Sequence, residues 1–287
     1  MNGRITPAER VDLAETLWDS GRAEEALATL AGSETVDAQV YALRGEIEFA
    51  LGRFQEAALS FTALVTAEPD CGDGHYNLGL ALLRTAKWEG AASALQRALR
   101  LDRNRPDAWA ALGVCLLESQ MPAEALTAFE RSRTHGIAGK APWAQACLGR
   151  ATALHLLSRF EEARSAYENL LESDPAHPDV IQNLIALAAA AGDLQALTHY
   201  SQRLLALDPH SIAALQGLAS VALYHGDFQS LARYCDQIMV LAPGSLEAQH
   251  NFSVATERLL AGIRGAGFNG APFAASPTAD PSAAGGK

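Results

Sequence analysis

Apolar residues recur along the chain at spacings of three and four, which is the period of an α-helix that buries one face. Residues 72–105 show the pattern well. Leu78 and Leu82 come before a break at Lys87, and a second stripe follows it at Ala91, Leu95 and Ala98. Two such stripes can face each other across a tight turn. The pattern therefore predicts helical hairpins and an all-α fold.

Glycine and proline mark the ends of these predicted helices. Glycine stands at several of the breaks between the two helices of a hairpin, where a left-handed residue costs least: Gly21, Gly52, Gly192 and Gly226. Proline follows several second helices, where it cannot continue the helix: Pro69, Pro175, Pro209 and Pro243. These positions predict where each hairpin turns and where the next one begins.

The hairpin pattern repeats at an offset of 34 residues. The predicted repeats are 7–37, 38–71, 72–105, 106–139, 144–177, 178–211 and 212–245, followed by a capping helix at 246–262. Residues 1–262 are thus expected to form one solenoid of about seven helix pairs. Residues 263–287 are rich in Gly, Ala, Pro and Ser, which predicts a disordered tail.

Two columns of small residues recur in register with the repeats. The first helices carry Ala14, Gly45, Gly79, Gly113, Ala151 and Ala219, and the second helices carry Ala26, Ala57, Ala91, Ala125 and Ala163. A bulky residue follows four positions after the second column, at Leu30, Phe61, Leu95, Phe129 and Tyr167. With these columns the chain resembles the tetratricopeptide repeat (TPR) family, whose unit is a 34-residue helix pair. The resemblance implies a right-handed superhelical solenoid.

Some repeats depart from these columns. Leu197 and Leu231 replace the second-helix alanine, while Ala188 and Ala222 replace a first-helix leucine, so large and small residues are exchanged and the core volume is kept. In the second repeat, Glu48 stands at that leucine column, and the sequence offers no account of it.

The resemblance implies that first helices line the concave face of the solenoid. A second, mostly apolar stripe lies on these helices beside the one that each hairpin needs for its own core. The candidate groove residues are Trp18, Phe49, Tyr76, Asn77, Leu80, Leu83, Val114, Leu117 and Leu148. Either the stripe packs against neighbouring repeats, or it forms a groove that receives a helix or an extended apolar segment of a partner.

A subset of the family clamps a C-terminal carboxylate with basic residues next to groove asparagines. Asn77 and Asn183 match those asparagines. Around Asn77, however, the columns that should carry the cations hold Ala42, Glu46, Asp107 and Ala111. Without a cation, capture of a carboxylate loses its main energetic term, so the sequence argues against this subtype.

The 287 residues carry a formal net charge of −11, which disfavours a nucleic-acid partner. Charge is also unevenly distributed, since residues 74–164 are net positive and the segments on either side are net negative. A basic region of one molecule could meet an acidic region of another, so self-assembly into homo-oligomers is an alternative. The arginines Arg97, Arg100, Arg103 and Arg105 either complement a helix dipole or form a docking patch.

The sequence shows no catalytic motif, metal-ligand spacing or phosphate-binding loop, so we expect no enzyme activity and no cofactor. The four cysteines are far apart and are expected to be buried free thiols. The longest apolar run, Ala108–Leu117, is too short to span a bilayer. Charged residues near the start disfavour a secretory signal, which favours a cytoplasmic location.

Two further segments carry open alternatives. Residues Thr134–Trp143 interrupt the repeat register and could form either a flexible joint or a stiff spacer. Phe268 and Phe273 in the tail could fold back into an apolar groove and compete there with the ligand.

The expected function is a non-enzymatic adaptor or scaffold for a protein or peptide partner. A homo-oligomeric scaffold and an assembly subunit of a secretion or pilus system are the alternatives.

Overall fold

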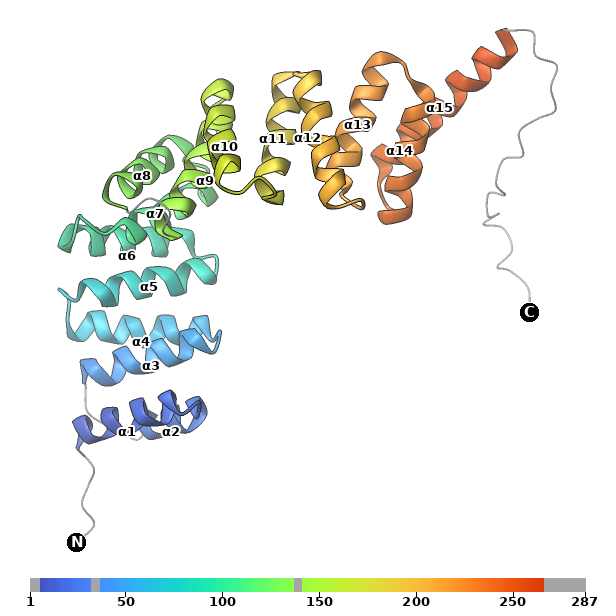
Figure 1. Ribbon diagram of the computed structural model, residues 1–287. Coiled ribbons are helices and arrows are strands. Elements are labelled where there is room, and N and C mark those ends of the chain that lie inside the picture. Colours follow the sequence, from blue (N-terminus) through green and yellow to red (C-terminus); the bar gives the residue numbers. More distant parts are fainter. Residues whose placement is uncertain (1–5, 32–36, 137–140, 266–287) are drawn as a thin grey trace, which may run out of the picture. The chain divides into compact units, whose positions relative to one another are not determined.

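The computed structural model describes residues 6–31, 37–136 and 141–265, and in these ranges the chain forms α-helices and no strands (Figure 1). The chain divides into two compact units, unit 1 (Met1–Leu187) and unit 2 (Ala188–Lys287). The division falls within a helix and not at residues 134–143, where the sequence suggested a joint; residues 137–140 lie outside the described ranges. The predicted all-α fold is confirmed.

The helices of unit 1 are α1 (Pro7–Asp19), α2 (Ala23–Ala31), α3 (Ala38–Ala50), α4 (Phe54–Ala67), α5 (Gly72–Arg84), α6 (Trp88–Leu101), α7 (Pro106–Glu118), α8 (Pro122–His135), α9 (Ala141–Leu156) and α10 (Phe160–Ser173). Unit 2 begins within α11 (Pro178–Ala191) and continues with α12 (Leu194–Leu207), α13 (Ile212–His225), α14 (Phe228–Leu241) and α15 (Leu246–Gly265). In unit 1 the pairs α1–α2, α3–α4 and α5–α6 follow one another as layers (Figure 1). First helices of neighbouring pairs also touch, α1 with α3, α5 with α7 and α7 with α9.

The turn within each hairpin uses a left-handed residue. Gly52, at φ 74°, ends α3, where its N–H donates to the Phe49 carbonyl at 3.0 Å and the next N–H, of Arg53, donates to the Glu48 carbonyl at 2.8 Å. The four glycines expected at this position all have positive φ. Three repeats place other residues there, namely Ala86, Gln120 and Ser158. The turn geometry therefore tolerates the steric cost of a Cβ in those repeats.

Side chains and prolines define several helix starts. The Thr6 hydroxyl accepts the Glu9 N–H at 3.3 Å, and the Glu9 carboxylate accepts the Thr6 N–H at 2.8 Å, which together form a capping box at α1. Pro106 and Pro122 occupy the first turns of α7 and α8, where a missing N–H costs nothing.

Close approach within a hairpin depends on the small-residue columns. A Cβ on Gly45 would lie 2.6 Å from the Phe61 ring. Likewise, a Cβ on Gly79 would lie 2.6 Å from Leu95, and one on Gly113 would lie 2.6 Å from Phe129. The bulky residue four positions after the alanine thus fills the space that the glycine leaves.

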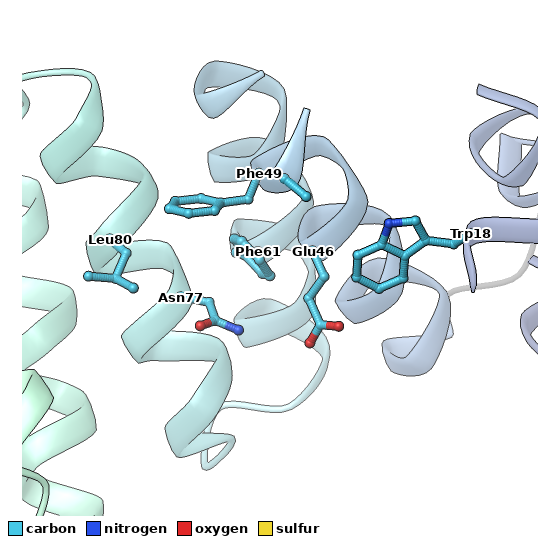
Figure 2. Close-up of a pocket in the computed structure, with 7 residues that line it drawn as sticks. Trp18, Glu46, Phe49, Phe61, Asn77 and Leu80 are labelled. Carbon is cyan, nitrogen blue, oxygen red and sulfur yellow. The ribbon is translucent and has the colours of Figure 1, made fainter. Parts of the chain in front are cut away.

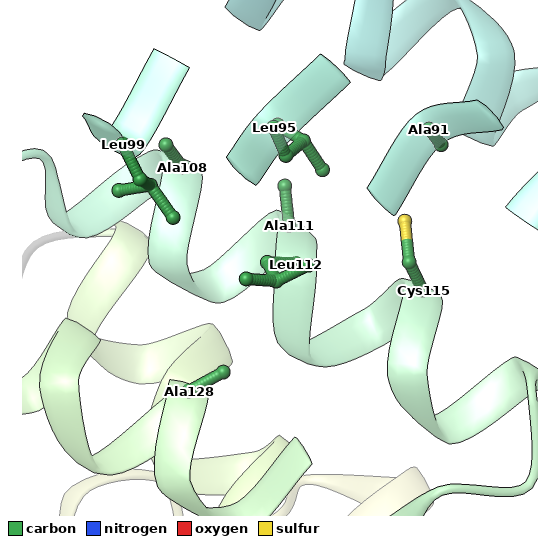
Figure 3. Packing of buried hydrophobic residues seen from close by; sticks show 8 residues of the cluster. All are labelled: Ala91, Leu95, Leu99, Ala108, Ala111, Leu112, Cys115 and Ala128. Carbon is green, nitrogen blue, oxygen red and sulfur yellow. The ribbon is translucent and has the colours of Figure 1, made fainter. Parts of the chain in front are cut away.

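The core continues from one hairpin into the next. Between α6, α7 and α8, one cluster of buried residues joins the third and fourth repeats (Figure 3). Its members are Ala91, Leu95, Leu99, Ala108, Ala111, Leu112, Cys115 and Ala128. Many of these side chains are alanine, so the helices can approach closely and the larger leucines fill the remaining space.

Unit 2 contains the predicted exchange of large and small residues. Leu231 is fully buried and clusters with Ala219 and Ala222. Ala255 of α15 belongs to the same cluster, so this last helix packs on the final hairpin. Helix α15 extends three residues past the predicted end of the capping helix at 262. The predicted tail from residue 266 onward, with Phe268 and Phe273, lies outside the described residues.

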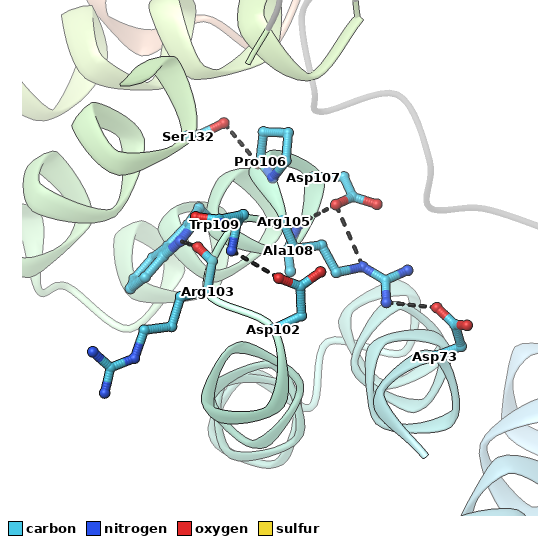
Figure 4. A network of polar contacts seen from close by, with 10 residues as sticks. Asp73, Asp102, Arg103, Arg105, Pro106, Asp107, Ala108, Trp109 and Ser132 are labelled. Carbon is cyan, nitrogen blue, oxygen red and sulfur yellow. Dashed lines mark hydrogen bonds and ion pairs between the residues drawn. The ribbon is translucent and has the colours of Figure 1, made fainter. Parts of the chain in front are cut away.

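Ion pairs join neighbouring repeats where the sequence placed a cluster of arginines. Arg97 of α6 binds Asp70 at 2.8 Å. Arg105 binds Asp73 at 2.6 Å and Asp107 at 3.5 Å (Figure 4). Two of the four arginines are therefore partnered within the chain, and neither of the two earlier interpretations anticipated this.

The cysteines differ in burial. Cys115 and Cys235 are buried as expected, whereas Cys71 and Cys147 are only half-buried. Burial raises the pKa of the Cys115 thiol to about 11. The prediction of four buried thiols thus holds for two of them.

Candidate binding groove

The nine candidate groove residues come from first helices of unit 1, and all are half-buried. Trp18 lies on α1, Phe49 on α3, and Leu148 on α9. Helix α5 supplies Tyr76, Asn77, Leu80 and Leu83, and helix α7 supplies Val114 and Leu117. One side of these apolar residues packs on the core clusters, as for Leu80 and Leu83 against the cluster around Leu95. Their other side is accessible to solvent. The stripe therefore packs in part against neighbouring repeats and in part remains open to a partner.

A first cavity of about 180 Å³ opens beside α3 and α5, and we call it the α3–α5 cavity (Figure 2). It is lined by Trp18, Glu46, Phe49, Ala50, Phe61, Asn77 and Leu80. The lining is apolar except for the Asn77 amide and the Glu46 carboxylate.

A second cavity of about 330 Å³, the α5–α7 cavity, lies next to the first. It is lined by Phe49, Tyr76, Leu80, Leu83, Arg84, Asp107, Ala111, Val114, Pro142 and Gln145. Phe49 and Leu80 line both cavities and form the wall between them. We call the two cavities together the groove; it crosses first helices from α1 to α9 within unit 1.

The structure brings most of the predicted residues together. Leu117 and Leu148 line neither cavity. Leu117 instead packs against the cluster of Ala125, Phe129 and Ala146, so the packing interpretation fits there. Lining residues outside the predicted set are Glu46, Ala50, Phe61, Arg84, Asp107, Ala111, Pro142 and Gln145. A signal for three of these existed, because Glu46, Asp107 and Ala111 occupy columns that face the groove in the carboxylate-clamp subset of the family.

An arginine orders one side of the α5–α7 cavity. The Arg105 guanidinium lies over the Tyr76 ring at 4.1 Å from its centroid and also pairs with Asp73 and Asp107. Burial, with a further contribution from the Asp107 charge, raises the pKa of the Tyr76 phenol to about 12. The phenol therefore stays neutral at physiological pH. In this part of the groove, Arg105 offsets part of the negative charge of Asp73 and Asp107.

The carboxylate of Glu46 has a different environment. Partial burial raises its pKa above the usual range, and the nearby charges of Asp73 and Glu15 raise it further. Within the described residues, the Glu46 carboxylate forms no ion pair and no hydrogen bond. The α3–α5 cavity thus combines an apolar lining with one uncompensated negative charge.

The described residues contain no group of three or more His, Cys, Asp or Glu side chains placed to hold a metal ion. In the same ranges, no helix is both long enough and apolar enough to cross a bilayer.

Solved structures with similar folds include several repeat proteins. YrrB, described as a TPR protein with an unusual peptide-binding site, matches at 18% identity with a TM-score of 0.57, over 67% of this chain and 96% of its own. PilW, a type IV pilus biogenesis factor, matches at 16% identity with a TM-score of 0.63, over 74% and 97%. The C-terminal part of a TPR protein from Cytophaga hutchinsonii matches at 16% identity with a TM-score of 0.66, over 84% and 98%. These similarities show a shared fold.

No curated protein sequence matches the chain. Family comparison, in contrast, finds the tetratricopeptide repeat at residues 11–74, 42–106 and 76–142, and again at 144–177. These matches cover more than half of the 287 residues and coincide with the hairpins of unit 1. The chain belongs to the tetratricopeptide repeat family.

Proposed function

We propose that this protein is a non-enzymatic adaptor that binds an apolar segment of a partner protein in the groove. The observation that carries the proposal is the pair of adjacent cavities that share Phe49 and Leu80 as a common wall. Cavities with mostly apolar linings and a few polar groups are typical of binding sites. A helix or an extended segment could place successive side chains in the two cavities.

Burial of the groove would supply binding free energy. The exposed sides of Leu80, Leu83 and Val114 gain roughly 25 cal/mol for each Å² that a partner removes from water. Charged groups surround this apolar strip, namely Glu46 at one cavity and Arg84 and Asp107 at the other. An apolar centre with a polar rim is the usual organisation of a protein interface.

The test uses 12-residue peptides selected against the full-length protein from an unbiased displayed library. Leu80→Glu places a charge on the wall between the cavities and should weaken binding of the selected peptides about tenfold or more. Leu59→Glu is the control, because Leu59 lies on the second helix α4 of a neighbouring repeat and is 73% exposed. It should leave affinity within about twofold.

Thermal unfolding of each variant separates loss of binding from loss of fold. Since Leu80 also packs on the core, Phe49→Ala provides a second groove variant in case Leu80→Glu is unstable. Selected peptides that bind both groove variants as tightly as the original protein would overturn the proposal.

The alternatives from the sequence have different tests. Self-assembly would appear as a molar mass that rises with protein concentration in light scattering. A role in a pilus or secretion system is compatible with the fold shared with PilW, but 16% identity does not transfer a partner. A cytoplasmic location stays a prediction, which localisation of the tagged protein in cells would test.

A further inference from the structure

Glu46 gives the α3–α5 cavity a chemical preference. Its carboxylate lies between the Asn77 amide and the Trp18 ring at the side of the cavity (Figure 2). Each of the other lining residues is uncharged. A partner that fills this cavity therefore removes water from a carboxylate, which costs free energy unless the partner brings a compensating charge.

Three acidic groups nearby, Asp73, Asp107 and Glu48, already have such a partner within the chain. Arg105 pairs with Asp73 and Asp107, and Arg44 pairs with Glu48. Glu46 has no ion pair among the described residues, and the two charges that shift its pKa, those of Asp73 and Glu15, are both negative. A positive charge is thus missing at this place, and a bound segment can provide it.

The size of the cavity suits one aromatic ring. Its volume is about 180 Å³. An apolar protein cavity of about 150 Å³ is known to hold benzene, so a phenyl group fits the available space. The Phe49 and Phe61 rings and Leu80 line the same space and offer apolar contacts to it (Figure 2).

Building on the proposed adaptor function, we infer that the partner is a basic aromatic segment, which places a phenyl ring in the α3–α5 cavity and a lysine or arginine against Glu46. The ring contributes affinity through apolar burial, and the cation contributes selectivity. A guanidinium or ammonium group in this position also lies beside the Trp18 ring, which favours cations through its π face.

The first part of the test is the sequence of the peptides selected from the unbiased library. We expect enrichment of peptides with an aromatic residue and with a lysine or arginine within about one helical turn of it. Enrichment of acidic residues at that spacing, or no charge preference at all, would overturn the inference.

The second part is a double-mutant cycle on one selected peptide. Glu46→Gln in the full-length protein should weaken binding about threefold to tenfold, and so should replacement of the peptide's basic residue by glutamine. Both changes together should cost no more than either one alone, because each removes the same interaction. Losses that simply add would show that Glu46 does not contact the cation.

Glu56→Gln is the matched control, since Glu56 is an exposed carboxylate on α4, away from the groove, without an ion pair in the described ranges. It should leave affinity unchanged. Glu46→Gln should also leave the unfolding temperature unchanged or slightly raised, so lost binding would not reflect lost fold.

The outcomes also separate this inference from the proposed function. If peptides bind through Leu80 and Phe49 but do not respond to Glu46→Gln, the groove function holds and the basic partner is wrong. If peptides respond to neither, both proposals fail.

Discussion

The Ser60 hydroxyl donates a 2.6 Å hydrogen bond to Oε2 of Glu48, a residue that is only 4% exposed. The other oxygen of this carboxylate accepts a 2.8 Å hydrogen bond from Arg44 Nε. Glu48 stands at a core column that holds leucine in several other repeats. The two donors explain how the second repeat accommodates a charge there, because a buried carboxylate is tolerated only when it is paired.

Ser60→Ala should therefore destabilise unit 1 by about 1.5–3 kcal/mol, since it removes a hydrogen bond to a buried charged group. Chemical denaturation measures this change. Thr62→Ala is the matched control on the same helix, because Thr62 is exposed and its hydroxyl donates only to the Ala58 carbonyl one turn earlier, not to a charged group. It should change stability by less than about 0.5 kcal/mol. Equal effects of the two substitutions would contradict the role given to Ser60.

Glycine-to-alanine substitutions in the third repeat should have opposite signs. Gly79→Ala places a Cβ 2.6 Å from buried Leu95 and should destabilise by about 1–3 kcal/mol. Gly90 is an exposed residue of α6, and a Cβ there meets its nearest neighbour, Leu82, at 3.4 Å, so Gly90→Ala should stabilise by about 0.5–1 kcal/mol.

A double mutant checks the cause of the Gly79 effect. When Leu95→Ala is already present, adding Gly79→Ala should cost much less than it does alone, because the clash has been removed. An undiminished cost would show that the glycine matters for another reason.

Alkaline pH should reveal the environment of Tyr76. Its pKa is raised to about 12 in the folded protein, chiefly by burial and then by the Asp107 charge. The unfolded chain, with a tyrosine pKa of about 10, releases this proton first. The contribution of the Tyr76 phenol to the free energy of unfolding is therefore fully present below about pH 10 and is lost as the pH rises toward about 12.

Tyr76→Phe removes this contribution, so the stability of the variant should fall less steeply over that interval. Urea unfolding at a series of pH values compares the two proteins. Spectrophotometric titration should in addition show that the variant lacks one of the late-titrating phenols. An identical pH dependence of the variant would rule out the raised pKa.

The sequence predicted the hairpins well because their determinants are local. Gly52 marks a left-handed turn, and Gly79 with Leu95 marks a close approach within one helix pair. Both depend on residues fewer than twenty positions apart. The role of Glu48 could not be predicted in the same way, although its partners are equally near in the sequence. Arg44 lies one turn away on α3, but the hydrogen bond from Ser60 depends on how α4 packs against α3.

The groove was predicted less completely. Trp18, Phe49 and Leu80 follow from an apolar stripe, and the structure places them around the cavities. Pro142 and Gln145 could not be inferred, because they reach the α5–α7 cavity through the packing of α9 on α7. From the sequence, Glu46 indicated only that a cation of the carboxylate clamp is missing at this column. In the structure, its position gives the α3–α5 cavity a negative charge.

The most direct test of the central claim is methyl NMR of the full-length protein during titration with a peptide selected from the displayed library. The account predicts that the methyl signals of Leu80, Leu83 and Val114 change with a single saturable dissociation constant, while those of Leu59 and Val240 stay constant. Saturable changes at Leu59 or Val240, with Leu80, Leu83 and Val114 unaffected, would contradict it.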